Sequence, residues 1–253
     1  MSHLEDKVAL ITGAGQGVGQ GIALALAAEG AKIAVTGRTL GKLEATCNLI
    51  EERGGSSIAL EANVKNADDL ARIVDETASK LGGLDVLVNN AQEVPLGPLD
   101  KVTDEAFTAG FESGPLAALR LMKLARPHMV KAGGGVIFNL VSSAGIRWDM
   151  AGYGAYGSVK QAMRPLTRAA ASEWGGDNIR VLSIAPHAES PGMKYWIENN
   201  PDEAKEFFKS IPLGRVGKCE EDIGRAVASL CAPNMAYLTG ATIPLDGGQA
   251  NFD

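Results

Sequence analysis

The sequence predicts a doubly wound α/β domain, with seven parallel strands in one sheet and helices on both of its faces. Short apolar runs alternate with helical stretches along the whole chain, which is the pattern of a parallel sheet covered by helices. No Pro- or Ser-rich linker, low-complexity tract or internal repeat divides the 253 residues. Because 45% of the residues are apolar, the chain can bury an ample core, and we expect residues 1–253 to form one domain.

Each expected element is bounded by a recognisable signal. Glycines end the first two helices, at Gly30 and Gly54, and Asn66 is the expected N-cap of the third. Gly114-Pro115 interrupts a long helix, because proline lacks the amide hydrogen that a helix interior needs. Helices are expected at about 20–29, 40–53, 67–81, 103–131, 155–174 and 220–231. Strands are expected at 8–12, 32–36, 58–60, 84–88, 136–141, 180–184 and 241–245.

Charge and composition argue against several classes of function. The formal charge of −6 and the scattered basic residues argue against a nucleic-acid surface. The three cysteines and three histidines are too dispersed to predict a metal site or a disulfide framework. Met1–Lys7 does not resemble a signal peptide, and no apolar run approaches the roughly 18 residues of a membrane span. We therefore expect a cytoplasmic protein that binds neither nucleic acid nor membrane.

A glycine-rich turn joins the first strand to the first helix. Gly13, Gly17 and Gly19 would let the backbone approach a pyrophosphate, which then meets the partial positive charge of the helix N-terminus. The same turn without a ligand would only connect two elements tightly.

The end of the second strand is where dinucleotide folds contact the adenosine ribose, and here Gly37 and Arg38 replace an acidic residue. A guanidinium binds a 2′-phosphate, and no carboxylate is expected there to repel it. NADP(H) is therefore predicted ahead of NAD(H), although Arg38 could instead lie on the surface and stack on adenine.

The stretch from Ser142 to Lys160 carries the candidate chemistry. Tyr156 and Lys160 are four residues apart, so on a helix they lie on one face, one turn apart. An ammonium beside a phenol favours the phenolate, so we expect the pKa of Tyr156 to fall below its usual value of about 10, as suits a general acid or base. A hydroxyl from Ser142 or Ser143 could bind the oxygen to which the proton moves. By itself, such a pair also fits an ordinary helix surface.

Taken together, the motifs resemble those of the short-chain dehydrogenase/reductase family nearly from end to end. They are similar to its glycine motif, its strand-four motif, its catalytic residues and its C-terminal signature. The matching segments are, in that order, Thr12–Gly19; Asn89-Asn90-Ala91; Ser142, Tyr156 and Lys160; and Leu238-Thr239-Gly240 with Asp246-Gly247-Gly248. The resemblance implies a Rossmann-type fold, which agrees with the strand count.

The resemblance also implies hydride transfer between a nicotinamide cofactor and a small carbonyl or alcohol substrate. Tyr156 would pass a proton to the carbonyl oxygen, Lys160 would lower the pKa of that phenol and bind the nicotinamide ribose, and Ser142 would hydrogen-bond the substrate oxygen. The residues expected at the cofactor are Gly13, Gln16, Gly17, Val18, Gly19, Arg38, Asn63, Val64, Asn90, Ala91, Tyr156, Lys160, Pro186 and His187.

Several positions depart from the pattern of the family. Gly114 stands where a catalytic Asn is usual, and it has no side chain to anchor a relay water behind the lysine, so we expect activity to survive at a reduced rate. Gln92 and His187 each replace a glycine; His187 either shapes the substrate pocket or bonds to the backbone. The segment from serine to tyrosine is one residue longer than usual, which keeps Ser143 open as the alternative to Ser142.

Residues 187–212 are expected to form a lid of one or two short helices, whose aromatic residues line an apolar pocket or pack against the body. Tyr153, two helical turns before Lys160, gives the wider spacing of the related enoyl reductases, so reduction of a carbon–carbon double bond is one alternative. A dinucleotide-binding protein without turnover is another, because three family positions near the chemistry have changed. From the family, we expect a homo-oligomer, either a tetramer or a dimer.

Overall fold

The computed structural model describes residues 3–147 and 151–250. The ends of the expected domain and part of the segment before Tyr156 therefore lie outside the described residues. The described strands form one parallel sheet of seven, in the order β3-β2-β1-β4-β5-β6-β7, which confirms the predicted doubly wound fold. The strands are β1 (Val8–Thr12), β2 (Lys32–Gly37), β3 (Ser56–Glu61), β4 (Val86–Asn89), β5 (Gly135–Leu140), β6 (Ile179–Pro186) and β7 (Thr242–Leu245).

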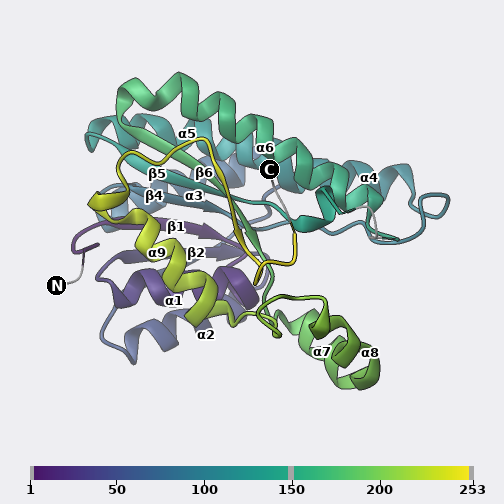
Figure 1. Cartoon of the computed structure of the whole chain (residues 1–253). Coiled ribbons are helices and arrows are strands. Elements are labelled where there is room, and N and C mark those ends of the chain that lie inside the picture. Colours follow the sequence, from purple (N-terminus) through teal and green to yellow (C-terminus); the bar gives the residue numbers. More distant parts are fainter. Residues whose placement is uncertain (1–2, 148–150, 251–253) are drawn as a thin grey trace.

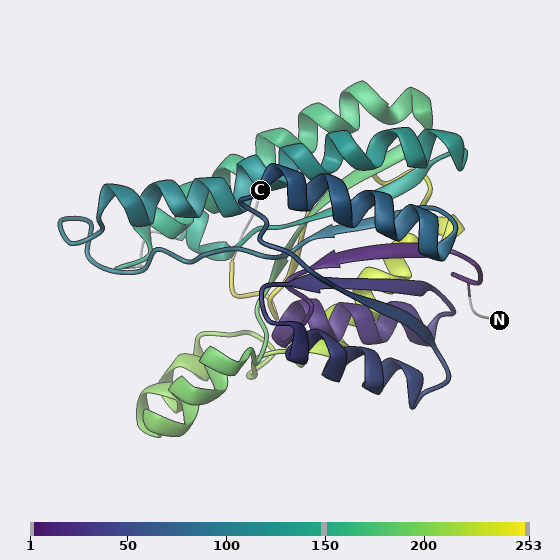
Figure 2. The same cartoon turned by 180° about the vertical axis from the view of Figure 1, so that it is seen from behind.

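Helices cover both faces of this sheet (Figures 1 and 2). On one face lie α1 (Gly17–Ala28), α2 (Leu40–Glu51) and α9 (Arg225–Cys231). On the other face lie α3 (Ala67–Leu81), α5 (Ala117–Lys131) and α6 (Gly154–Trp174). Successive side chains of β1 point to opposite faces of the sheet: Ala9 and Ile11 pack on the face covered by α1, α2 and α9, and Leu10 packs on the other face. Burial on both faces explains why the strands read as continuous apolar runs.

The long helix expected over 103–131 is divided by a wider turn. Helix α4 (Asp104–Phe111) is followed by a π-helical turn, Glu112–Leu116, and then by α5. Pro115 lies inside this turn, which accommodates the missing amide hydrogen without ending the helical path. Asn66 caps α3 as predicted, because its side chain accepts from the amides of Asp68 and Asp69.

The C-terminal half holds the two short helices expected in the lid, α7 (Pro191–Asn199) and α8 (Pro201–Lys209). They project from the body beyond the carboxyl ends of the strands (Figure 1). The helix expected over 220–231 begins as a second π-helical turn, Cys219–Gly224, before α9. Short 3₁₀ turns occur at Ser143–Gly145, Gly175–Asp177 and Pro233–Met235.

The strand order indicates where on the sheet a ligand would bind. The chain leaves β1 toward β2 and returns to β4 on the other side of β1, so the connections diverge at the carboxyl ends of β1 and β4. Ligands of open parallel sheets bind at such a switch point. The glycine turn follows β1, and the Asn89-Asn90-Ala91 segment begins at the end of β4, at that same edge.

Candidate active site

The glycine turn between β1 and α1 is packed so closely that side chains are excluded from it. Gly13 and Gly17 have left-handed backbones, with φ of +66° and +61°. A Cβ at Gly19 would lie 2.5 Å from the Gly13 carbonyl oxygen and 2.5 Å from Asn90 Nδ2. That amide donates to the carbonyls of Thr12 and Gly13. The N-cap side chain of α1 makes no capping hydrogen bond. The turn is therefore a bare backbone cradle at a helix N-terminus, which fits a pyrophosphate.

Thr12 holds the glycine turn against the segment that follows β4. Its hydroxyl donates to the Val88 carbonyl at 3.2 Å and accepts from the amides of Asn90 at 2.9 Å and Ala91 at 3.0 Å. The two segments that the sequence assigns to the cofactor are thus joined by one buried side chain.

Arg38 lies at the end of β2, but the expectation that no carboxylate is near it is wrong. Arg38 Nη1 and Lys65 Nζ each lie 3.1 Å from Oε1 of Glu93. Glu93 follows the β4 motif and is 55 residues from Arg38 along the chain, so only the fold brings them together. Because two cations share one carboxylate, this cluster keeps a net positive charge.

The other residues expected at the cofactor lie near the same edge of the sheet. Asn63 follows β3 and its Oδ1 accepts from the Lys65 amide at 3.1 Å. Val64 is buried. Gln16, at the N-cap of α1, is held by a hydrogen bond to its Oε1, and Val18 packs against the core.

The structure brings Ser142, Tyr156 and Lys160 together between the end of β5 and the start of α6. A side-chain hydrogen bond links the Tyr156 hydroxyl to Ser142, so the Ser142 hydroxyl lies beside the phenol. Lys160 Nζ lies 5.8 Å from the centroid of the Tyr156 ring and donates to the Leu140 carbonyl oxygen at 2.6 Å. Lys160 is only 5% exposed.

Burial shifts the pKa of Tyr156 upward, whereas the sequence predicts a downward shift. Burial raises the pKa of Tyr156 to about 12, although the hydrogen bond with Ser142 acts to lower it. Burial also lowers the pKa of Lys160 to about 7. The expectation that the ammonium lowers the pKa of the phenol is therefore wrong for the protein alone, because the same burial destabilises the ammonium that was to do so.

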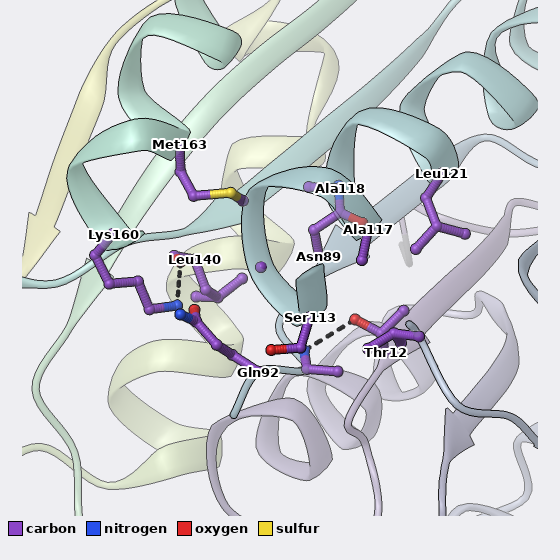
Figure 3. Close-up of a pocket in the computed structure, with 13 residues that line it drawn as sticks. Thr12, Asn89, Gln92, Ser113, Ala117, Ala118, Leu121, Leu140, Lys160 and Met163 are labelled. Atoms are coloured by element: carbon purple, nitrogen blue, oxygen red, sulfur yellow. Dashed lines mark hydrogen bonds between the residues drawn. The ribbon is translucent and has the colours of Figure 1, made fainter. Parts of the chain in front are cut away.

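A small cavity lies beside Lys160, and Gln92 is among the residues that line it (Figure 3). Gly114 lines the same cavity and lies against Gln92. A Cβ at Gly114 would lie 3.2 Å from Cδ and Nε2 of Gln92 and 3.0 Å from Cγ1 of Val159. The Gln92 amide therefore occupies space that a side chain at position 114 would need.

Ser113, in the π-helical turn, fixes this arrangement. Its hydroxyl donates to the Ala109 carbonyl at 2.7 Å and accepts from the Glu93 amide at 2.9 Å. The first bond adds to the backbone hydrogen bond that the Ala109 carbonyl already accepts from the Glu112 amide. The second ties the residue after Gln92 to that turn, so Gln92 is held opposite Gly114.

Pro186 and His187 close the far side of the site at the end of β6. The His187 amide donates to the Leu245 carbonyl at 3.0 Å, and its ring meets Phe207 of α8 edge to face at 5.4 Å. Burial lowers the pKa of His187, and its Nδ1 is buried without a partner in the described part of the chain. His187 thus both joins the backbone network and packs against α8.

The start of α7 lies close to the glycine turn. A Cβ at Gly17 would lie 3.3 Å from Cδ of Pro191, the first residue of α7. The Tyr153 and Tyr156 rings lie 6.2 Å apart, and Leu99 lies against Gly154, two residues before Tyr156. The approach to Tyr156 is therefore bordered by apolar side chains.

Residues 3–147 and 151–250 contain neither a metal-binding cluster nor a membrane-spanning helix. No group of three or more His, Cys, Asp or Glu residues is placed to hold a metal ion. None of the helices there is both long and apolar enough to cross a membrane.

Comparison with known proteins identifies the family. A family model described as enoyl-(acyl carrier protein) reductase matches residues 13–250. A 12α-hydroxysteroid dehydrogenase from Clostridium sp. is 36% identical over 98% of both chains. The solved structure of a 7α-hydroxysteroid dehydrogenase complexed with NADH and 7-oxo glycochenodeoxycholic acid has a TM-score of 0.92 and 32% identity, covering 98% of this chain and 96% of the other. The chain belongs to the short-chain dehydrogenase/reductase family.

A second solved structure, a putative NAD(P)-dependent gluconate 5-dehydrogenase from Beutenbergia cavernae with bound NADP, has a TM-score of 0.89 and 30% identity, covering 97% of both chains. The chain is thus a short-chain dehydrogenase/reductase, an enzyme that acts on CH–OH and C=O groups of small molecules with a nicotinamide dinucleotide as cofactor.

Sequence reasoning missed three residues that organise this dehydrogenase/reductase site. Thr12 stands out only as part of the glycine motif, and no sequence motif marks Ser113 or Glu93. Ser113 directly precedes Gly114-Pro115, and a hydroxyl beside a helix-interrupting proline is a signal that could have been used. Nothing in the sequence reveals the pairing of Glu93 with Arg38, because it depends on how the β4 segment folds back to β2.

Proposed function

We propose that this dehydrogenase/reductase uses NADP(H) to interconvert a ketone and a secondary alcohol, with Tyr156 as the general acid and base. The observation that carries the proposal is the hydrogen-bonded pair Ser142–Tyr156, with Lys160 beside it, at the same sheet edge as the glycine cradle. A phenol, a second hydroxyl and an amine of this arrangement suit proton transfer to a carbonyl oxygen.

In the mechanism, the bound nicotinamide would supply the hydride to the carbonyl carbon, or accept it in the reverse direction. Tyr156 donates its proton to the carbonyl oxygen, and Ser142 donates a hydrogen bond to the same oxygen as negative charge develops there. Lys160 lies beside the resulting phenolate, where an ammonium stabilises the negative charge.

The residues proposed to hold the dinucleotide are those that fold around the cradle. Gly13, Gln16, Gly17, Val18 and Gly19 surround the pyrophosphate. Asn63 and Val64 flank the adenine, while Asn90, Ala91, Pro186 and His187 border the nicotinamide half with Tyr156 and Lys160.

The preference for NADP(H) rests on Arg38 and Lys65. The Arg38 guanidinium and the Lys65 ammonium, which now pair with the Glu93 carboxylate, would bind a 2′-phosphate instead. The relatives differ on this point, since one solved structure carries NADH and another NADP. NAD(H) is therefore the alternative cofactor, and measuring the affinity for both dinucleotides would distinguish the two.

The proposed substrate is a ketone or secondary alcohol on a sizeable apolar framework. Segment 187–212 would close over it, and the exposed side chains of Leu99, Tyr153 and Tyr195 support an apolar pocket wall. The relatives named as hydroxysteroid dehydrogenases support the same choice. We further propose a cytoplasmic homo-oligomer, a tetramer or a dimer, whose interface includes apolar residues of α5 and α6.

The decisive experiment is NADPH oxidation with a panel of apolar ketones, including 7-oxo and 12-oxo steroids. Tyr156→Phe should lower kcat by about 10²–10⁴-fold, the usual contribution of a positioned general acid, while NADPH still binds. Tyr153→Phe is the matched control and should stay within about threefold of the wild type.

Two alternatives are separated by the same panel. The family model is described as an enoyl reductase, so an enone whose C=C bond is reduced in a Tyr153-dependent way would favour that reaction. Binding of NADPH with no turnover of any substrate would favour a dinucleotide-binding protein.

A further inference from the structure

The orientation of the Ser142 hydroxyl depends on the short 3₁₀ turn, Ser143–Gly145, that follows it. Ser142 is the N-cap of this turn, and its Oγ accepts from the Ala144 amide at 3.2 Å. A hydroxyl oxygen that accepts in this way keeps its own proton, which is available to the Tyr156 oxygen or to a substrate oxygen. The position of the Ala144 amide therefore determines where the Ser142 proton can point.

A turn this short is only weakly stabilised by its own hydrogen bonds. The Gly145 amide donates to the Ser142 carbonyl at 3.2 Å, and 3₁₀ hydrogen bonds have poorer geometry than those of an α-helix. Packing against α6 adds to their stability, since a Cβ at Gly157 would lie 2.7 Å from the Ala144 carbonyl oxygen. The backbone of the turn therefore lies directly against the helix that carries Tyr156.

Gln161, in α6, joins the turn to the helix. Its Nε2 donates to the Gly145 carbonyl oxygen. A Cβ at Gly145 would lie 2.7 Å from Cγ of the same glutamine, so the side chain also packs closely on the turn. Two kinds of contact, a hydrogen bond and close packing, therefore hold the Gln161 amide against the end of the turn.

The amide of Gln161 is oriented by a second side chain of α6. Its Oε1 accepts from Arg164 Nη1 at 3.3 Å, and a guanidinium can only donate. Arg164 Nε also donates to Thr242 Oγ1 at 3.2 Å, on strand β7. The amide oxygen therefore faces Arg164, and the nitrogen is the atom that faces the Gly145 carbonyl.

Two neighbouring residues of α6 thus hold the chain on both sides of Ser142. Lys160 donates to the Leu140 carbonyl, two residues before the serine. Gln161 donates to the Gly145 carbonyl, three residues after it. The segment that carries the hydroxyl is therefore fixed to α6 at both of its ends.

We propose that Gln161 is a positioning residue for Ser142: by holding the Gly145 carbonyl, it keeps the Ala144 amide against the Ser142 oxygen. Gln161 acts through the serine and not on the substrate itself. Its value for turnover rests on the function proposed above, in which Ser142 donates to the substrate oxygen. The effect of Gln161 on the turn does not depend on that function.

The variant Gln161→Glu isolates the hydrogen bond to the turn. An ionised carboxylate can still accept from Arg164 but has no proton to donate to Gly145. Gln161→Met loses both hydrogen bonds, so the two variants should behave alike if the bond to the turn is the one that matters. Asn178→Asp is the matched control, because Asn178 Nδ2 donates to the Gly133 carbonyl at 3.0 Å at the amino end of β6, away from the site.

Amide hydrogen exchange in the free protein is the first measurement. Exchange at Ala144 should become about 3–10-fold faster in Gln161→Glu and Gln161→Met, a change that corresponds to the loss of one hydrogen bond. It should keep the wild-type rate in Asn178→Asp. An unchanged rate at Ala144 in folded Gln161→Glu overturns the inference. If Gln161→Glu does not fold, Gln161→Met decides, and if neither variant folds, Gln161 is needed for folding itself and the inference is overturned.

Turnover of a ketone with NADPH is the second measurement. Gln161→Glu should lower kcat by about 3–10-fold and leave KM for the ketone within about twofold of the wild type. In the Ser142→Ala background the same change should alter kcat by less than about twofold, because the side chain through which Gln161 acts is gone. An equal loss of kcat in both backgrounds means that Gln161 acts through general stability, and it overturns the inference. If exchange at Ala144 responds as expected but the wild type reduces no ketone, the proposed function has failed and the inference stands.

Discussion

At the scale of single residues, the burial that encloses the site also disfavours the charged forms of Tyr156 and Lys160. Tyr156 and Lys160 are both desolvated, so the pKa of the phenol rises and that of the amine falls. The spacing of the two residues predicted their proximity correctly, but helical spacing carries no information about depth in the fold. This is why the direction of the pKa shift of Tyr156 could not be predicted from the sequence.

Lys160 should make folding stability depend on pH. Between pH 7 and about 10.5 the unfolded chain keeps a proton on this lysine that the folded protein has released, so stability rises with pH in that window. From pH 7 to pH 9 the expected gain in the free energy of unfolding is about 2 kcal/mol. Lys160→Met should abolish that gain, as measured by urea unfolding at the two pH values. Tyr156→Phe should retain the gain, and a slope equal to wild type in Lys160→Met would contradict the assignment.

Glu93 should tune the choice of cofactor. Glu93→Gln keeps the shape of the side chain but removes the negative charge beside Arg38 and Lys65. We expect NADPH to bind several-fold more tightly and NADH to change less than about twofold, because the removed charge would face only a 2′-phosphate. Calorimetric titration of both cofactors measures this. An equal change in affinity for the two cofactors would mean that Arg38, Lys65 and Glu93 do not contact the 2′-phosphate.

At the scale of elements, the parts with strong periodic signals were predicted well. Each strand lies within about two residues of its expected range, and Asn66 caps α3 as expected. The sequence marked an interruption at Gly114-Pro115 but not its form, because a kink, a break and a π turn all follow from a missing amide hydrogen. The hydrogen bond from the Glu93 amide to Ser113, which ties the π turn to the segment after β4, comes from the tertiary fold.

The packing of α1 against the second π turn should be intolerant of any side chain. A Cβ at Gly224 would lie 2.3 Å from the Gly21 carbonyl oxygen, so Gly224→Ala should destabilise the protein by about 1–3 kcal/mol. Gly41→Ala is the control: a Cβ there meets nothing within 4 Å, and the residue is in α2. The control should be stabilised by about 0.5–1 kcal/mol. Denaturant unfolding compares them, and an unaffected Gly224→Ala would show that the two elements can separate.

At the scale of the whole molecule, the strand order is what assembles the site. The glycine turn, Arg38, Gln92, Ser142 and Lys160 come from separate parts of the chain, and the parallel sheet brings them to one edge. The alternation of elements was enough to predict the sheet, and the spaced motifs were enough to predict the family. Contacts between loops at that edge, such as Glu93 with Arg38 and Gln92 with Gly114, could not be predicted because no periodicity governs them.

The most direct measurement is a crystal structure of the enzyme with NADP⁺ and a secondary alcohol that it oxidises. We expect the alcohol oxygen to lie within about 3.2 Å of both Tyr156 Oη and Ser142 Oγ, with the carbinol carbon over the nicotinamide ring. An alcohol oxygen held by Tyr153 instead, or a Tyr156 hydroxyl turned away from the nicotinamide, would contradict it.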